Sequence, residues 1–191
     1  MGNRKLRIAV MALQGAFIEH ERMLRQLGAE AFEIRQLADW QRPKDGLILP
    51  GGESTTQFKL LTDLQLLEPV RRDIEAGLPV FGTCAGLILL ARDVVGEPWP
   101  RLSTMDIRVR RNAYGRQLGS FVIRRPMKGV GDVSMTFIRA PYIEEVRRGA
   151  EVLATVDGHI VAARQGHQLV TAFHPELTDD TSVHQLFLDS I

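Results

Sequence analysis

The chain has 191 residues, with 24 Lys and Arg against 23 Asp and Glu and a formal net charge of +1, so its charge does not point to nucleic acid or an anionic membrane as a partner. Hydrophobic residues make up 45% and charged residues 25%, and no apolar run approaches the roughly 20 residues of a membrane span. The single cysteine excludes a disulfide framework and a cysteine-rich metal site. Without a signal-peptide pattern at the N-terminus, we expect a cytoplasmic protein that needs no metal or cofactor.

The first half of the chain alternates predicted strands with predicted helices. Apolar runs predict strands at residues 7–13, 31–37, 46–49 and 78–81, and helical patterns cover residues 19–27, 55–61 and 64–76. This alternation is typical of a mostly parallel, doubly wound sheet with helices on both faces.

After residue 100 the pattern changes to shorter strands. We expect them at residues 105–110, 119–123, 133–137, 152–156, 160–164 and 169–172. Turns at 157–158 and 165–166 separate the last three and predict an antiparallel meander. A helix at 181–190, capped by Asp180 or Thr181, ends the chain. The prediction is therefore one α/β domain over residues 1–191 with a small antiparallel extension.

The only cysteine lies in the pentapeptide Gly82-Thr83-Cys84-Ala85-Gly86, between apolar runs at 78–81 and 87–91. A nucleophile flanked by small residues, where a strand turns into a helix, is the sequence form of a nucleophile elbow. Glycine on either side allows the strained turn, and the N–H groups at the helix N-terminus favour a thiolate. Taken alone, the pentapeptide is equally compatible with a buried structural cysteine.

A base for this nucleophile is predicted in Phe173-His174-Pro175-Glu176, directly after the strand expected at 169–172. Catalytic groups of open α/β sheets commonly lie where a strand gives way to a loop. Pro175 fixes the backbone between His174 and Glu176, so the carboxylate can orient the imidazole toward Cys84. The other four histidines, His20, His159, His167 and His184, are expected to be structural, with His184 in the polar part of the last helix.

An oxyanion hole is predicted where the strand at 46–49 breaks into Pro50-Gly51-Gly52-Glu53-Ser54. The backbone N–H groups of Gly52 and of Ala85, the residue after the nucleophile, would bind the oxyanion of a tetrahedral intermediate. An ordinary turn before a capped helix is the alternative for this short segment.

Six segments together carry a resemblance to a known family. They are Ala12-Leu13-Gln14-Gly15-Ala16-Phe17, residues 49–56 around Gly51-Gly52-Glu53-Ser54, the pentapeptide around Cys84, Arg111-Asn112-Ala113-Tyr114-Gly115-Arg116-Gln117, Phe137-Ile138-Arg139-Ala140-Pro141, and residues 173–178 around His174. The chain resembles a class I glutamine amidotransferase and, more narrowly, the glutaminase subunits of pyridoxal 5′-phosphate synthase. The match runs nearly end to end.

The resemblance implies a flavodoxin-like fold and hydrolysis of L-glutamine to L-glutamate and ammonia. It implies catalysis by Cys84, His174 and Glu176, and glutamine binding by Gly52, Glu53, Ser54, Arg111, Ile138 and Arg139. An arginine suits the α-carboxylate of the substrate. The implied partner is a synthase subunit with a (β/α)8 barrel, which uses the ammonia, and Gln14, Gly15 and His20 are candidate contacts with it.

Three other functions remain open from the residues alone. A glutaminase of another pathway would share the elbow but not the segments at 111–117 and 138–141. A peptidase or deglycase of the related superfamily usually has histidine directly after the nucleophile, where this chain has Ala85. A binding subunit with a redox-sensing thiol would not need the other predicted catalytic groups.

Overall fold

The computed structural model describes residues 2–111 and 120–191. Its first half alternates strand and helix as predicted, with most boundaries within three residues. The elements are β1 (Arg7–Met11), α1 (Phe17–Gln26), β2 (Glu30–Ile34), α2 (Leu37–Trp40), β3 (Gly46–Leu49), α3 (Ser54–Asp63), α4 (Leu67–Glu75), β4 (Val80–Thr83) and α5 (Ala85–Leu90).

The second half is mostly antiparallel. It contains β5 (Ala91–Val94), β6 (Met105–Arg110), β7 (Ser120–Met127), β8 (Gly131–Ile138), β9 (Tyr142–Val146), β10 (Ala150–Val156), β11 (His159–Gln165), β12 (Gln168–Thr171), the 3-10 turn η1 (Pro175–Leu177) and α6 (Ser182–Asp189). The elements α2, β5, β9 and η1 were not predicted. The turns α2 and η1 are too short to show a helical period, β5 continues an apolar run that we assigned to a helix, and β9 carries two adjacent glutamates.

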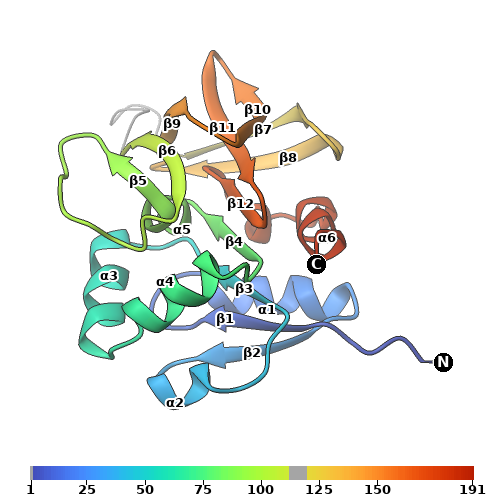
Figure 1. Ribbon diagram of the computed structural model, residues 1–191. Coiled ribbons are helices and arrows are strands. Elements are labelled where there is room, and N and C mark those ends of the chain that lie inside the picture. Colours follow the sequence, from blue (N-terminus) through green and yellow to red (C-terminus); the bar gives the residue numbers. More distant parts are fainter. Residues whose placement is uncertain (1, 112–119) are drawn as a thin grey trace.

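The sheet order brings together the two segments that carry Cys84 and His174. The main sheet runs β2-β1-β3-β4-β12-β11-β9-β6-β5, with β10 pairing β11, and β7 pairs β8 in a separate hairpin. The predicted meander β10-β11-β12 is antiparallel, but β12 then pairs in parallel with β4, with Thr171 opposite Thr83. The segment after β12 therefore lies beside the segment after β4. Figure 1 shows β12, in red, next to the green β4.

Helices surround the parallel strands, and the antiparallel strands form the other end of the molecule (Figure 1). The core is continuous between the two halves, and its largest fully buried side chains include Phe81, Phe137, Phe173 and Phe187. The last helix begins one residue later than predicted, and the Asp180 carboxylate accepts a hydrogen bond from Ser182 N at 3.0 Å.

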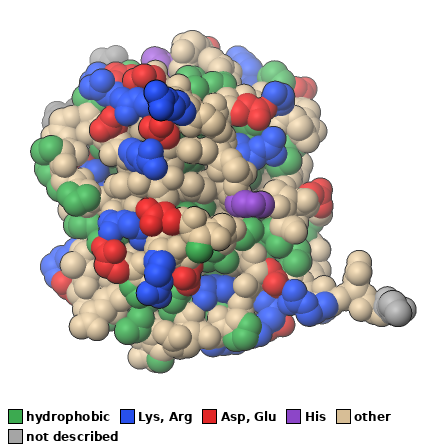
Figure 2. Space-filling model, in the orientation of Figure 1, with side chains coloured by type: hydrophobic (Ala, Val, Ile, Leu, Met, Phe, Trp, Pro, Cys, Tyr) green, Lys and Arg blue, Asp and Glu red, His purple; other side chains and the backbone are tan. Residues whose placement is uncertain are grey.

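Within the described residues, no helix is both long and apolar enough to cross a membrane. Basic and acidic side chains are interspersed over the face drawn in Figure 2.

Candidate active site

Cys84 stands at a strained turn between β4 and α5. Its backbone has φ 49° and ψ −99°, in a region that non-glycine residues rarely adopt. The turn is possible because glycine flanks it on both sides. A Cβ at Gly86 would lie 2.2 Å from the carbonyl oxygen of Leu49, so the helix reaches β3 only with glycine there. The predicted elbow geometry is thus present.

His174 and Glu176 follow β12 and form the predicted pair. His174 Nδ1 lies 2.6 Å from Glu176 Oε1, and both side chains are buried. Two backbone hydrogen bonds fix this region: Cys84 N donates to Thr171 O and His174 N donates to Thr136 O, each at 2.8 Å. Because Nδ1 is engaged by the carboxylate, Nε2 is the ring nitrogen left for Cys84.

The surroundings of His174 favour its protonated form. Burial alone would lower the pKa of His174, but hydrogen bonds and charge interactions with Cys84 and Glu176 outweigh burial and raise this pKa to about 10. The imidazole therefore carries a proton at neutral pH, as a proton donor to a leaving group must.

Gly51 packs directly against the face of His174. A Cβ at position 51 would lie 2.2 Å from His174 Cε1 and 2.7 Å from Nδ1. The adjoining loop is braced by the segment after β1, since Ala16 N donates to Gly51 O at 2.9 Å and Glu53 N donates to Gln14 Oε1 at 2.8 Å. Gln14 therefore supports the loop of the predicted oxyanion hole, a role not expected from the sequence.

A cavity of about 490 Å³ opens over Cys84 and His174. Every predicted site residue lines it except Glu176, which lies behind His174, and Ala85, which is buried in α5. The remaining lining residues are Gln14, Gly15, Ala16, Gly51 and Ile88. Arg139, at the end of β8, also has a left-handed backbone, with φ 44°. Strain of this kind clusters at functional sites.

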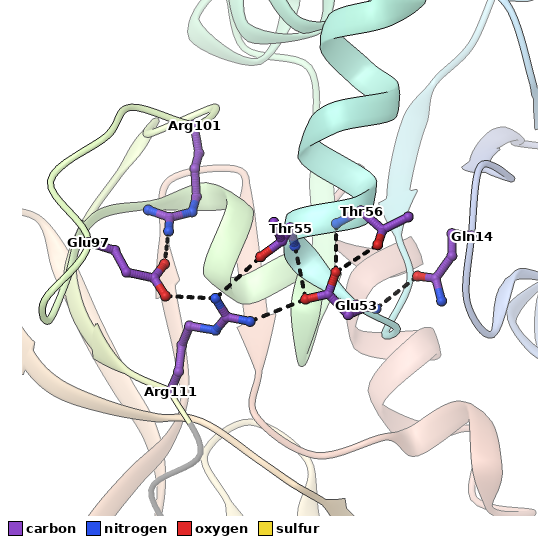
Figure 3. A network of polar contacts seen from close by, with 7 residues as sticks. All are labelled: Gln14, Glu53, Thr55, Thr56, Glu97, Arg101 and Arg111. Carbon is purple, nitrogen blue, oxygen red and sulfur yellow. Dashed lines mark hydrogen bonds and ion pairs between the residues drawn. The ribbon is translucent and has the colours of Figure 1, made fainter.

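Arg111 is held at the rim of the cavity by two carboxylates (Figure 3). Its guanidinium donates to Glu97 Oε1 at 2.7 Å and to Glu53 Oε1 at 3.3 Å. Glu97 also pairs with Arg101, whose side chain is only 4% exposed. Sequence reasoning missed Glu97 because its segment has no regular pattern. Residues 112–117 of the segment that includes Arg111 lie outside the described residues.

Glu53 caps α3 and carries a negative charge at the rim of the cavity. Its carboxylate accepts hydrogen bonds from the backbone N–H groups of Thr55 and Thr56 and so caps α3. Burial alone would raise its pKa, but these N–H groups, the Thr56 hydroxyl and Arg111 outweigh burial and lower the pKa of Glu53. Glu53 is therefore an anion at the rim of the cavity, suited to a substrate ammonium group.

Two histidine predictions were wrong in placement. His20, suggested as a contact with a partner, has no exposed surface, and His184, expected in the polar part of the last helix, is equally buried. The two rings lie together behind Glu176, with His20 Nδ1 2.8 Å from His184 Nε2. Gly15 and Gln14, by contrast, lie at the cavity rim.

Among residues 2–111 and 120–191, no three His, Cys, Asp or Glu side chains form a group that could hold a metal ion. The ionisable side chains that line the cavity are those of Cys84, His174, Glu53, Arg111 and Arg139.

Solved structures first define the class of protein. A crystal structure of a glutamine amidotransferase superposes with a TM-score of 0.91 at 44% identity, covering 96% of this chain and 97% of that one. A glutamine amidotransferase from Thermotoga maritima, with a TM-score of 0.62 at 17% identity, shares the fold over 98% of this chain and 84% of that one.

Sequence relatives narrow the class to one family. The model of the SNO glutamine amidotransferase family matches residues 10–191. A relative from Methanocorpusculum labreanum named pyridoxal 5′-phosphate synthase subunit PdxT is 61% identical over 186 residues, 97% of this chain and 98% of its own length. A protein of the same name from Streptococcus pneumoniae is 56% identical over 187 residues, 96% of each chain. The chain belongs to the SNO glutamine amidotransferase family, which confirms the resemblance found in the sequence.

Proposed function

We propose that this chain is the glutaminase subunit of a pyridoxal 5′-phosphate synthase, with residues 1–191 acting as one domain. It hydrolyses L-glutamine to L-glutamate and ammonia through a thioester on Cys84. The observation that carries the proposal is the arrangement of Cys84 on a strained elbow, in one cavity with His174, whose Nδ1 is oriented by Glu176. Family membership and the names of the closely similar relatives support the same activity.

The rim of the cavity offers complementary charges for an amino acid. The Glu53 carboxylate suits the α-ammonium group and the Arg111 guanidinium suits the α-carboxylate. In the structure these two side chains pair with each other at 3.3 Å, so glutamine would replace one weak ion pair by two new contacts. Glu97 keeps its own bond to Arg111 and holds the guanidinium in position. Gly52, Ser54, Ile138 and Arg139, which also line the cavity, complete the proposed glutamine site.

The reaction begins when the Cys84 thiolate attacks the carboxamide carbon of glutamine. The carbonyl π bond breaks, and the oxygen becomes an oxyanion that the N–H groups of Gly52 and Ala85 stabilise. Loss of one such donor typically raises the barrier by about 2.7–4 kcal/mol. The His174 imidazolium gives its Nε2 proton to the leaving nitrogen, which departs as ammonia and leaves a γ-glutamyl thioester. Neutral His174 then accepts a proton from water, whose oxygen attacks the thioester and releases glutamate.

Ammonia in bulk water becomes ammonium, which is a poor nucleophile, so a glutaminase for biosynthesis profits from docking on the enzyme that uses the ammonia. We propose a partner with a (β/α)8 barrel that builds pyridoxal 5′-phosphate from a pentose phosphate and a triose phosphate, in a hetero-oligomeric complex in the cytoplasm. The loop braced by Gln14 is the element that such a partner would set for catalysis.

The test is glutamate release from glutamine by this chain, alone and with the synthase subunit of the same organism. Strong stimulation by that subunit is expected. Glutaminase activity indifferent to the subunit would refute the pathway, and no release under either condition would refute the glutaminase.

A further inference from the structure

Behind the proposed triad lies a fully buried pair of histidines with no part in the mechanism above. His20 on α1 and His184 on α6 come from opposite ends of the chain, and neither has exposed surface. His20 Nε2 lies 3.2 Å from Thr83 Oγ1, the residue before the nucleophile, and 3.6 Å from Glu176 Oε2. His20 thus contacts both the elbow and the carboxylate that orients His174, and His184 contacts His20 from behind.

Both rings are neutral in this environment. Burial, with smaller contributions from His184 and His174, lowers the pKa of His20 well below its usual value. Burial lowers the pKa of His184 to about 4. Phe81, whose ring lies edge-on to both imidazoles, also faces the pair, and Thr83 and Glu176 face His20. The 3.6 Å contact is therefore a dipolar contact with a carboxylate and not an ion pair between two charges.

A neutral pair joined by one hydrogen bond has two possible arrangements of protons. If His20 Nδ1 donates to His184 Nε2, then His184 Nδ1 carries a buried proton without an acceptor among residues 2–111 and 120–191, and the lone pair of His20 Nε2 faces Glu176 Oε2. If instead His184 Nε2 donates to His20 Nδ1, then His20 Nε2 carries a proton that Thr83 Oγ1 accepts and that also faces Glu176 Oε2.

The second arrangement costs less. It leaves only a lone pair on His184 Nδ1 without a partner and places the positive end of an N–H bond beside a carboxylate oxygen. That oxygen has no hydrogen-bond partner in the part of the chain that the structure describes, and His20 Nε2 faces it at 3.6 Å. A buried carboxylate oxygen without such a partner is costly, so the second arrangement, which turns an N–H dipole toward it, stabilises the more demanding group.

We propose that His20 and His184 are positioning residues for the glutaminase reaction, a proposal that rests on the function given above. His184 fixes the tautomer of His20, and His20 Nε2–H holds Glu176 Oε2 and Thr83 Oγ1. Glu176 is thereby held with Oε1 on His174 Nδ1, and the elbow is fixed from the same side. The pair touches neither substrate nor reacting atoms.

The kinetic test uses the full chain with its synthase subunit. Substitution His20→Leu removes the N–H group that faces Glu176 and should lower kcat about 3- to 10-fold, with KM nearly unchanged, because a 3.6 Å contact is weaker than a hydrogen bond to a charged group. His20→Gln keeps a side-chain N–H at the position of Nε2 and should restore most of kcat. The exposed His167→Gln is the matched control and should leave both constants unchanged.

A second variant tests whether His184 acts on Glu176 through His20. His184→Leu should lower kcat in the wild-type background but cause no further loss in the His20→Leu background, because both changes interrupt one route. Additive losses would show that His184 does not act through His20 and would overturn the proposal. A wild-type kcat for His20→Leu would overturn it as well. Since wild-type activity is measured in the same assay, failure of the proposed glutaminase function is seen separately.

A spectroscopic readout needs no activity. Nitrogen-15 histidine spectra of the full chain, assigned with these variants, report the tautomer of each ring. We expect His20 and His184 neutral and protonated on Nε2 near neutral pH. Protonation of either ring on Nδ1 would overturn the proposal.

Discussion

Replacing Gly51→Ala tests the position of His174 most sharply. The added Cβ would lie 2.2 Å from His174 Cε1, whereas ordinary contacts begin at 3.4 Å, so the ring must retreat by about 1.2 Å. A retreat of this size breaks the 2.6 Å contact between His174 Nδ1 and Glu176 Oε1 and moves Nε2 relative to Cys84.

A misplacement of about 1 Å in a catalytic group can cost about 100-fold in rate, so we expect kcat to fall at least about 100-fold. Overpacking typically lowers the free energy of unfolding by about 1–3 kcal/mol, which leaves the chain folded. The assay is glutamate release in the presence of the synthase subunit, together with urea unfolding.

The matched control is Gly46→Ala on β3, away from the cavity. A Cβ there would meet the side-chain ends of Ile191 and Phe187 at 3.0 Å, so stability should fall while kcat is kept. If Gly51→Ala keeps kcat within about twofold of wild type, the described packing of His174 against Gly51 is wrong.

Three further predictions follow from the described contacts. Glu97→Gln weakens the hold on Arg111 and should raise KM for glutamine several-fold with little change in kcat; a changed kcat at constant KM would contradict the proposed role of Glu97. The folded-state pKa of His174 is raised from 6.5 to about 10, so its contribution to stability is complete below pH 6.5 and is lost as the pH rises toward 10. Urea unfolding across this range should show a falling free energy of unfolding, and His174→Gln should flatten that slope; an equal slope in the variant would refute the assignment. Gln14→Ala frees the backbone N–H of Glu53 and should lower kcat by about tenfold, the value of one lost hydrogen bond, whereas unchanged glutamate release would show that Gln14 does not support the loop.

Much of the fold could be predicted because local patterns determine it. The alternation of apolar strands and amphipathic helices before residue 90 predicted the parallel sheet, and the turns at 157–158 and 165–166 predicted the meander. The side-by-side position of β12 and β4 follows from long-range pairing, which no local pattern encodes. The His174 motif could be assigned to the elbow only because a nucleophile requires a base.

The contact between the buried His20 and His184 could not be predicted from the sequence. His20 lies three and four residues before Met23 and Leu24 on the apolar face of α1, and His184 lies three residues before Phe187 on that of α6. This spacing indicates burial, but a contact between residues 164 positions apart depends on the tertiary fold. Glu97 was missed because its segment has no regular pattern and because only the fold brings it to Arg111.

The most direct test of the central claim is mass spectrometry of the chain quenched during turnover of glutamine with the synthase subunit. The account predicts a γ-glutamyl adduct on the peptide that contains Cys84, absent from a Cys84→Ala variant that also releases no glutamate. Full glutamate release by the Cys84→Ala variant would contradict the account.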